Sequence, residues 1–478
     1  MGKKKFVKAI TSRDEDFAQW YTDVCRKAAL MDYSEAKGFI IYRPYGFALW
    51  EGMKNYLDQA FKRTGHDNVY MPLLIPESLF MKEAEHVEGF APETAMVTMG
   101  GKEELQERLI IRPTSEVLFC NHYSRVIESH RDLPKKYNQW CSVVRWEKTT
   151  RPFLRGSEFL WQEGHTAHAS EEEARKEALD ILDIYEKLGS ELLAIPFVTG
   201  IKTEREKFAG AVDTYTIEAL MHDNKALQSG TTHYLGTGFA EAFNIKFQDK
   251  DGKVKPVYQT SWGVSTRLIG AVIMVHGDDS GLVLPPYLAP VQVDIIPIMS
   301  HKAGVMEKAE ELKETLEAQG IRVKIDDTDK SPGWKFSESE MRGTPIRLEV
   351  GPRDIENNQV ILVKRYNREK LNFALDGVTN EIPALLKEIH QSMYENALKN
   401  VQDNTHEAKD YQIFKQLMDE QGGYVKMMWC GDEACELQVK EDTKATSRCI
   451  AMDHEAIGEE CPVCHKKAKH LVYFAKAY

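Results

Sequence analysis

The stretch that decides the fold runs from residue 141 to residue 169 and reads CSVVRWEKTTRPFLRGSEFLWQEGHTAHA. Two runs rich in aromatic and β-branched residues flank a polar segment, Thr149–Pro152. This pattern predicts two strands joined by a long turn. Residues two apart on a strand share a face, so Arg145 and Glu147 are expected to point the same way. One face of the second run is expected to carry four residues: Phe159, Trp161, Glu163 and His165.

That predicted face combines charged groups with large rings. A guanidinium, two carboxylates, an imidazole and two aromatic rings would share one surface. An antiparallel sheet can expose one face to water, but an ordinary wet face rarely places Trp and Phe beside so much charge. The pattern favours a ligand-binding surface. An exposed hairpin with chance ion pairs is the alternative that the pattern leaves open.

Length and composition limit the class of protein. A chain of 478 residues is long enough for two or three domains, and 42% hydrophobic with 28% charged residues is ordinary for a globular protein. The net charge of −12 argues against a general nucleic-acid binder. No apolar run approaches the ~20 residues of a membrane span, and the basic segment Met1–Lys8 is not followed by the apolar core of a secretory signal. We therefore expect a cytoplasmic protein with no membrane partner.

A strand, a proline and a helix are predicted over residues 38–65. The strand ends at Pro44, and Gly65 is a plausible helix stop. Apolar residues recur at helical spacing between them: Phe47, Trp50, Met53, Leu57 and Phe61. From the residues alone, this stripe indicates a core helix.

Two further stretches end in polar residues that suit a ligand. Residues 109–119 predict a strand, a turn and a helix start, with Thr114 or Ser115 as the cap. Residues 258–276 predict a polar strand running into an apolar helix, with Arg267 at the helix entrance. An unpaired arginine is costly in a core, and a helix N-terminus favours an anion. The second stretch therefore predicts a phosphate site.

Five of the eight cysteines lie between residues 430 and 464. Four of them form two closely spaced pairs: Cys430 with Cys435, and Cys461 with Cys464. In a reducing compartment such pairs are metal ligands or free thiols more often than disulfides, and this spacing suits a tetrahedral zinc site. Cys449 is a rival ligand and His465 a weaker one. Free thiols on two hairpins are the remaining alternative.

The central stretch resembles a known family. Arg145-x-Glu147, a loop and then Arg155-x-x-x-Phe159 are similar to motif 2 of the class II aminoacyl-tRNA synthetases. The fuller string from Arg151 to His165 resembles prolyl-tRNA synthetases of the archaeal and eukaryotic type, and the likeness extends over nearly the whole chain. It implies that residues 38–65 are motif 1, whose helix builds a homodimer interface. It also implies that Arg267 belongs to motif 3.

The resemblance implies an α/β (α+β) protein of three domains. Residues 1–284 would form the class II catalytic domain on an antiparallel sheet. Residues 285–395, where short apolar strands alternate with helices after Pro285-Pro286, would form an α/β anticodon-binding domain. Residues 396–478 would form a small C-terminal zinc-binding α+β domain with structural Zn²⁺. Candidates for the RNA-facing surface are Lys335, Arg342, Arg347 and Arg353.

The implied reaction is the ATP-dependent activation of L-proline to prolyl-adenylate, followed by transfer of proline to the 3′ end of tRNA(Pro), with Mg²⁺ sharing the phosphate charge. The implied catalytic residues are Arg145 and Arg267. The implied proline-binding residues are Thr114, Glu116, Arg145, Trp161, Glu163, His165, His233 and Ser265. The implied ATP-binding residues are Arg145, Glu147, Arg155, Phe159, Gln228, Thr231 and Arg267. By pattern alone, a lone histidine such as His233 would more often be a satisfied core residue.

Several rival functions stay open at this point. Motifs 1 to 3 alone also suit a synthetase for threonine, glycine or histidine, but the pair Thr114 and Glu116 and the string Trp161–His165 favour proline. A catalytically dead paralogue would have lost motif arginines, and the zinc region lacks the basic, aromatic-rich surface of an RNA-binding module. The bacterial type carries a large editing insertion between motifs 2 and 3, for which the interval from Phe159 to Gln228 leaves no room. Misactivation of alanine or cysteine is a further hypothesis to test. In an apolar pocket, a difference of one methylene between two substrates changes the free energy by only ~1–3 kcal/mol, so a small apolar ring is poorly distinguished.

Overall fold

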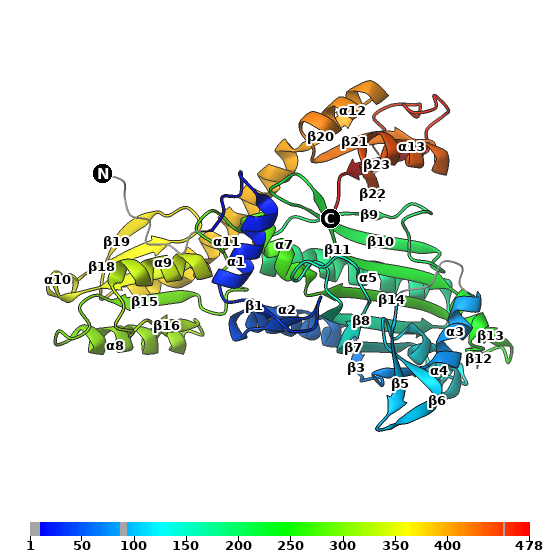
Figure 1. Ribbon diagram of the computed structural model, residues 1–478, viewed down its shortest axis with the longest axis horizontal. Coiled ribbons are helices and arrows are strands. Elements are labelled where there is room, and N and C mark those ends of the chain that lie inside the picture. The colour runs from blue at the N-terminus through cyan, green and yellow to red at the C-terminus, as the bar shows by residue number, and fades with distance from the viewer. Residues whose placement is uncertain (1–9, 87–92, 453–454) are drawn as a thin grey trace.

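The computed structural model describes residues 10–86, 93–452 and 455–478, so the basic segment Met1–Lys8 lies outside the described residues. An eleven-stranded sheet runs through the molecule in the order β20-β21-β23-β22-β9-β10-β11-β14-β8-β7-β3 (Figure 1). In chain order its strands are β3 (Asp67–Asn68), β7 (Lys135–Val144), β8 (Glu158–His168), β9 (Val198–Ile201), β10 (Asp213–Leu220), β11 (Ala226–Gly236), β14 (Tyr258–Ser265), β20 (Thr405–Ala408), β21 (Tyr424–Trp429), β22 (Thr446–Ala451) and β23 (His470–Ala475).

The predicted pair of strands in the central stretch is β7 and β8. They are antiparallel, with Gln139 opposite Glu163 and Cys141 opposite Trp161. The strand β7 ends at Val144, and the backbone N–H of Arg145 continues the ladder by donating to the carbonyl of Ser157. Glu147 follows in the connecting turn, so its side chain is not held by strand alternation as the sequence pattern predicted.

Helices cover one face of the sheet. The helix α5 (Glu171–Leu188) packs on β8, β10, β11 and β14, and α7 (Arg267–His276) packs on β11 and β14. The side chain of Ser170 accepts from the Glu173 N–H and caps α5, which has three glutamates in its first turn. The apolar surfaces of α5, α7, α1 (Phe17–Lys27) and α2 (Pro44–Arg63) form one core with this face of the sheet.

The helix predicted at 38–65 is α2, which follows the hairpin β1 (Met31–Tyr33) and β2 (Ile40–Tyr42). Trp50, Met53, Leu57 and Phe61 are buried in the core of their own chain. Phe47, which the sequence placed on the same stripe, is 40% exposed instead. The stripe thus forms a core-facing helix surface, and any partner chain would meet a different face of α2.

Smaller elements flank the large sheet. A three-stranded sheet is formed by β4 (Leu74–Pro76), β6 (Glu103–Ile111) and β5 (Ala95–Gly100), and β12 (Lys246–Gln248) pairs with β13 (Val254–Pro256). The helices of this region are α3 (Glu77–His86), α4 (Glu116–Val126) and α6 (Gly238–Ala242). Between Phe159 and Gln228 the chain forms α5, a π-helical turn at Gly189–Leu193 and the strands β9 and β10, with no further domain.

A separate five-stranded sheet follows the double proline, in the order β16-β15-β17-β18-β19. Its elements are β15 (Val293–Pro297), α8 (Val305–Ala318), β16 (Val323–Ile325), α9 (Pro332–Arg342), β17 (Ile346–Val350), α10 (Pro352–Glu356), β18 (Gln359–Lys364) and β19 (Lys370–Ala374). The strand β15 is parallel to β16 and β17, and β18 and β19 are antiparallel. This confirms the predicted alternation of strands and helices.

Two of the four basic residues suggested for an RNA-facing surface are in the interior of this domain. Lys335 is buried and donates to the carbonyl of Asp326 at 2.7 Å. Arg347 is buried and pairs with Glu349 at 2.9 Å and with Glu340 at 3.2 Å. Both predictions are wrong, because these charges are satisfied internally. Arg342 is partly exposed and paired with Glu338, and Arg353 is exposed.

The C-terminal region joins the large sheet through β22, which pairs with β9. It adds α12 (Tyr411–Glu420) and α13 (Glu433–Thr443), and it is reached along the helix α11 (Val378–Asp403). The predicted division between residues 395 and 396 lies inside this continuous helix. The chain ends docked on β11, since the Tyr478 N–H donates to the carbonyl of Ala226. Among the described residues, no helix combines the length and the apolar character needed to cross a bilayer. The architecture confirms the α/β (α+β) class.

Candidate functional site

A cavity of about 580 Å³ lies over strands β8, β11 and β14. Cross-strand rows bring its polar groups together. One row runs from Glu163 through Gly263 to Thr231, and the next runs from His165 through Ser261 to His233. The predicted site residues that line this cavity are Thr114, Glu116, Arg145, Trp161, Glu163, His165, Gln228, Thr231 and His233. The shared face predicted from alternation therefore exists for the cavity-lining residues of β8.

Two carboxylates hold an imidazole at one end of the cavity. His165 lies with Nε2 at 3.1 Å from Glu163 and Nδ1 at 3.4 Å from Glu116. All three side chains are buried, and the His165 ring stacks on Phe119 with centroids 4.1 Å apart. Burial disfavours the charged ring, but the two carboxylates outweigh it and raise the pKa of His165 to about 10. His165 is therefore an imidazolium at neutral pH.

Glu163 is held by more donors than His165 alone. The backbone N–H of Ser115 donates to it at 3.1 Å and the amide of Gln139 at 2.8 Å. Burial by itself would raise the pKa of Glu163, but the bonds and charge from His165 and the bonds from Ser115 lower it to about 2. Glu163 is thus a permanent carboxylate that fixes the start of α4 against β8.

The predicted helix cap at Thr114 or Ser115 is wrong in its chemistry. Ser115 occupies the N-cap position of α4, but its side chain makes no capping bond. Its hydroxyl instead accepts from Gln139 at 2.9 Å, and the Thr114 hydroxyl points to Glu163 at 3.5 Å. The turn is held by the neighbouring strands, which leaves Glu116 in the first turn of α4 beside His165.

His233 has the opposite protonation state. Its Nδ1 lies 2.9 Å from the Thr214 hydroxyl and its Nε2 lies 3.2 Å from the Thr231 hydroxyl. Burial first, and then the positive charge of His165, lower the pKa of His233 to about 3. Phe208 stacks on the ring with centroids 4.7 Å apart. His233 therefore forms a neutral wall of the cavity.

Arg145 projects into the cavity from the end of β7. Its Nε donates to the carbonyl of Pro113 at 3.1 Å, and its guanidinium lies 5.4 Å from the ring centroids of both Phe159 and Trp161. Burial lowers its pKa, although Glu163 and Glu147 oppose that shift. Among the described residues, no acceptor is hydrogen-bonded to its two terminal nitrogens. These donors are available for an anionic ligand.

Arg267 and Arg155 add positive charge nearby. Arg267 donates from Nε to the carbonyl of Leu154 at 3.1 Å and from a terminal nitrogen to the carbonyl of Gln228 at 3.2 Å. Burial, followed by repulsion from Arg155 and Arg145, lowers the pKa of Arg267 to about 10. An anion bound among the three guanidinium groups would relieve that repulsion, so the site fits a polyphosphate.

Some predicted site residues do not line the cavity. Arg155 is half-exposed and lies 3.7 Å from Glu147, so these two side chains face each other. Phe159 does not line the cavity itself, but its ring lies against the guanidinium of Arg145, which does. Ser265 lies opposite Trp161 on β14, and its hydroxyl accepts from the Arg267 N–H at 3.2 Å. In its place Ser261 and Gly263 line the cavity.

Sequence reasoning missed three residues that organise the site. Gln139 shares strand parity with Cys141 and Arg145, so alternation along β7 could have identified it. Phe208 and Thr214 come from the charged loop before β10 and from β10 itself. Thr214 lies directly opposite His233 in the antiparallel pair of β10 and β11, so the strand register could have identified it. Nothing in the local sequence connects Phe208 to His233, because that contact depends on how the loop folds back.

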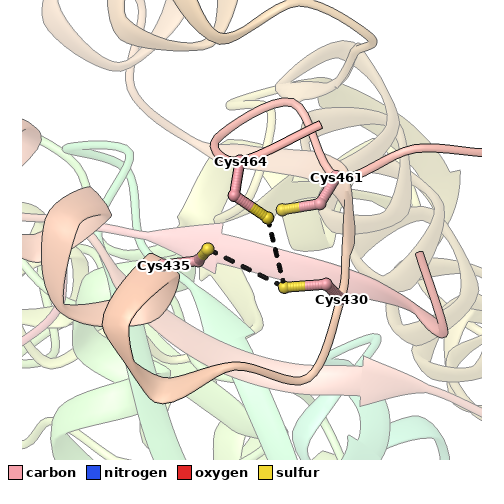
Figure 2. Close-up of side chains that lie close together, drawn as sticks. All are labelled: Cys430, Cys435, Cys461 and Cys464. Atoms are coloured by element: carbon pink, nitrogen blue, oxygen red, sulfur yellow. Dashed lines mark hydrogen bonds between the residues drawn. The ribbon is translucent and has the colours of Figure 1, made fainter. Parts of the chain in front are cut away.

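The second site is a cluster of four cysteines (Figure 2). The Sγ atom of Cys430 lies 3.7 Å from that of Cys435 and 3.6 Å from that of Cys464, and all four sulfurs, including Cys461, lie within 4.8 Å of one another. Thiolates bound to one Zn²⁺ at ~2.3 Å in a tetrahedron would lie about 3.8 Å apart. The four residues therefore fit a structural zinc ion. Cys449 is buried on β22 near the Thr199 carbonyl, and neither it nor His465 belongs to the cluster.

Comparisons with known proteins agree with this geometry. Residues 97–276 match the family model of the tRNA synthetase class II core domain (G, H, P, S and T). Residues 292–385 match an anticodon binding domain, and residues 411–478 match the prolyl-tRNA synthetase C-terminal domain. The three matches follow the order of the three regions described above.

Full-length relatives narrow the family. The chain is 60% identical over 476 residues to a proline--tRNA ligase of Clostridium novyi, covering 100% of this chain and 99% of that protein. It is 58% identical over 475 residues to proline--tRNA ligase 2 of Bacillus cereus, covering 99% of this chain and 100% of that protein. A crystal structure of prolyl-tRNA synthetase from Cryptosporidium parvum, complexed with halofuginone and AMPPNP, superposes with a TM-score of 0.94 at 39% identity, covering 98% of this chain and 99% of that one. The chain therefore belongs to the prolyl-tRNA synthetases, a family of class II aminoacyl-tRNA synthetases.

Proposed function

We propose that the cavity over β8, β11 and β14 is the place where this chain activates proline. The family's reaction, ATP-dependent joining of proline to tRNA(Pro), is the activity of this chain. The observation that carries the assignment of the site is its charge balance. Glu116 and Glu163 carry two negative charges and His165 carries one positive charge, so the cluster has an excess of one negative charge. That excess suits one substrate ammonium group.

Proline in solution is a zwitterion, and the cavity offers a partner to each end. Its secondary ammonium group would meet Glu116, beside the Thr114 hydroxyl. Its carboxylate would meet the two terminal nitrogens of Arg145. Its small apolar ring would lie between Trp161 and the neutral His233. A protonated His233 would repel the ammonium group, so the low pKa of His233 favours binding.

In the first step a carboxylate oxygen of proline attacks the α-phosphorus of ATP. The bond from that phosphorus to the bridging oxygen breaks, and pyrophosphate leaves with the electron pair. Arg145 would bridge the carboxylate and the α-phosphate, while Arg155 and Arg267 would hold the outer phosphates. Arginine suits this work because its planar fork binds two oxygens and stays charged. Mg²⁺ bound with ATP supplies further neutralisation of phosphate charge.

The adenosine part of ATP would lie toward the motif 2 turn. Phe159 offers a ring for adenine, and Glu147 offers an acceptor for its amino group. Gln228 and Thr231 would contact adenine or ribose. Since Glu147 and Arg155 face each other at 3.7 Å, ATP binding would separate that pair. In the second step the terminal ribose hydroxyl of tRNA(Pro) attacks the adenylate carbonyl, and AMP leaves.

Three properties of the whole enzyme complete the proposal. The four-cysteine cluster would hold a structural Zn²⁺, because four thiolates occupy all the positions of a tetrahedral site and leave none open for a substrate or water. The chain would work as a homodimer through the face carrying β1, β2 and the start of α2, where apolar side chains are exposed. Its place of action would be the cytoplasm, where aminoacylated tRNA is consumed in translation.

Pyrophosphate exchange with a panel of amino acids tests the substrate. Exchange should require proline and should be far slower with threonine, glycine or histidine. Slow exchange with alanine or cysteine is expected from the weak discrimination of an apolar pocket. Undetectable exchange with both would remove the misactivation hypothesis. Proline-independent exchange, or a preference for another amino acid, would contradict the assignment of the site.

The variant Glu116→Gln tests the charge balance directly. It should raise the KM for proline by about 100-fold, because the cluster loses its negative excess, and it should leave the KM for ATP nearly unchanged. Glu172→Gln, at an exposed carboxylate in the first turn of α5, is the matched control and should behave like the unmodified enzyme. An equal rise of both KM values would argue against an amino-acid-binding role for Glu116.

A further inference from the structure

The loop between β9 and β10 lies between a cavity and a groove of the molecule. Its C-terminal part, residues 206–209, lines the cavity assigned above to proline. Its N-terminal part, residues 202–204, lines a groove of about 540 Å³ formed with β21, β22 and β23 of the C-terminal region. The loop therefore contacts the substrate cavity with one half and the C-terminal region with the other.

Thr203 anchors the loop in the C-terminal region. Its hydroxyl donates to Oε1 of Glu436 at 2.9 Å and lies 3.2 Å from the Ser447 hydroxyl. The Ser447 hydroxyl is hydrogen-bonded to the same Glu436 oxygen. All three side chains are buried, with exposed fractions of 1–3%. Glu436 directly follows Cys435 on α13, so this contact joins the loop to the segment that carries the cysteine cluster.

Lys202, the residue before Thr203, is held in place by an ionic contact. Its ammonium lies 2.7 Å from Glu218 on β10 and donates to the carbonyl of Arg448 on β22, also at 2.7 Å. Arg448 donates to the other oxygen of Glu218 at 3.0 and 2.9 Å. Glu218 is fully buried. Breaking such a network leaves an unpaired buried charge, so the start of the loop has one strongly preferred position.

The other end of the loop touches the substrate cavity. Phe208 stacks on His233, and its backbone N–H donates to the Thr214 hydroxyl at 3.1 Å. The same hydroxyl contacts Nδ1 of His233. Four residues separate Thr203 from Phe208, so a shift at the anchor must be absorbed over a very short segment before it reaches the cavity wall.

We propose that Thr203 and Glu436 act as positioning residues for amino-acid binding, with the C-terminal region holding the Phe208 wall in place through them. We call this pair the clasp. The inference rests on the proposed function of the cavity as the proline site. It assigns to the C-terminal region a part in the affinity for the amino acid, in addition to the stability of the chain.

The variant Thr203→Val tests the clasp, because it keeps the shape of the side chain and removes the donor. The KM for proline in pyrophosphate exchange should rise about tenfold, as expected for a lost bond to a buried carboxylate. The KM for ATP and the kcat at saturating proline should stay within about twofold, because the arginines are untouched. Trypsin should also cleave after Arg205 or Lys207 faster than in the unmodified enzyme.

Matched variants separate positioning from general destabilisation. Thr443→Val removes another buried hydroxyl of α13, one that bonds to Val439 and does not contact the loop. It should leave the KM for proline unchanged. Glu436→Gln keeps an acceptor oxygen, so its KM values should stay close to those of the unmodified enzyme. Glu436→Ala removes the acceptor and should reproduce the effect of Thr203→Val. Zinc content, measured on every purified variant, should not change.

Three results would overturn the clasp. They are an unchanged KM for proline in both Thr203→Val and Glu436→Ala, an equal rise in the KM for ATP, and an equal effect from Thr443→Val. The proposed function fails separately, through Glu116→Gln. If that variant leaves the KM for proline unchanged, the cavity is not the proline site, whatever the clasp variants show.

Discussion

At the scale of single residues, His165 and His233 show how partners decide a protonation state. Both rings are buried and line the same cavity, at the two ends of one cross-strand row with Ser261 between them. His165 lies between two carboxylates, and His233 lies between two threonine hydroxyls. Their pKa values are therefore driven apart, to about 10 and about 3. The result is a fixed positive charge and a neutral wall side by side.

His165→Gln should reveal this charge through the pH dependence of stability. The pKa of His165 is raised in the folded state, so its stabilising contribution is complete below about pH 6.5 and is lost as the pH rises toward about 10. The difference in the free energy of unfolding between the unmodified protein and the variant should shrink over that range. The slope is at most about 1.4 kcal/mol per pH unit. Denaturant titrations at several pH values measure it.

The matched control for that experiment is His233→Gln. The pKa of His233 is lowered to about 3, so this ring is neutral in both the folded and the unfolded state above pH 7. The stability difference for His233→Gln should therefore be constant from pH 7 to pH 10. A constant difference for His165→Gln over the same range would show that His165 is not held as an imidazolium.

Two arginines near each other are expected to respond differently to truncation. Arg145→Ala should lower the rate of pyrophosphate exchange at least about 100-fold, because donors aimed at the reacting phosphate are lost. Its melting temperature should change little, since the side chain makes a single hydrogen bond to the described residues. Arg112 is 1% exposed and donates to the carbonyls of Ser142 and Met71.

Arg112→Ala should destabilise the fold by about 3 kcal/mol or more, because it leaves those carbonyls unsatisfied in the interior. Calorimetry and exchange rates on the two variants measure the contrast. Retained exchange in Arg145→Ala would refute the role proposed for Arg145. A large fall in its melting temperature would instead make it a structural residue like Arg112.

At the scale of elements, strand periodicity was enough to predict much of the site. The alternation along β8 gave Trp161, Glu163 and His165 a shared face, because each position has only two choices of side. The same reasoning failed at Glu147, since β7 ends at Val144 and a turn has no fixed period. The cap predicted at Ser115 failed for a related reason. The local chain offered a cap, but Gln139 from β7 offered a buried partner for the same hydroxyl.

The cysteine cluster joins the two closely spaced cysteine pairs that the sequence predicted as one metal site. Cys461→Ser should lower the zinc content from one ion per chain toward zero and should lower the melting temperature, because metal binding is coupled to folding of the segment. Cys449→Ser changes a buried cysteine outside the cluster and should keep the metal. Metal analysis and thermal melts on both variants provide the measurement. An unchanged zinc count in Cys461→Ser would exclude Cys461 as a ligand.

At the scale of the whole molecule, the pairing of strands that are far apart in the chain could not be predicted from the sequence. The C-terminal strands extend the catalytic sheet through β22 and β9, which are separated by more than 200 residues in the chain (Figure 1). No local pattern predicts such a partner. The same limit explains the error at Lys335 and Arg347. A basic residue in the sequence does not reveal whether its charge lies at the surface or is already paired in the interior.

The assembly of two chains is the last prediction at this scale. Since the buried stripe of α2 already belongs to its own core, the dimer surface should use the exposed apolar residues beside it: Tyr33, Ile41 and Phe47, which are 54%, 53% and 40% exposed. Exposed large apolar side chains are enriched at interfaces. The double variant Ile41→Asp with Phe47→Asp should convert a dimer into a monomer in light scattering, because burying two carboxylates is costly. Val254→Asp, at a 66% exposed residue of β13, should leave the dimer intact. A monomeric unmodified protein, or a double variant that stays dimeric, would contradict the use of this face.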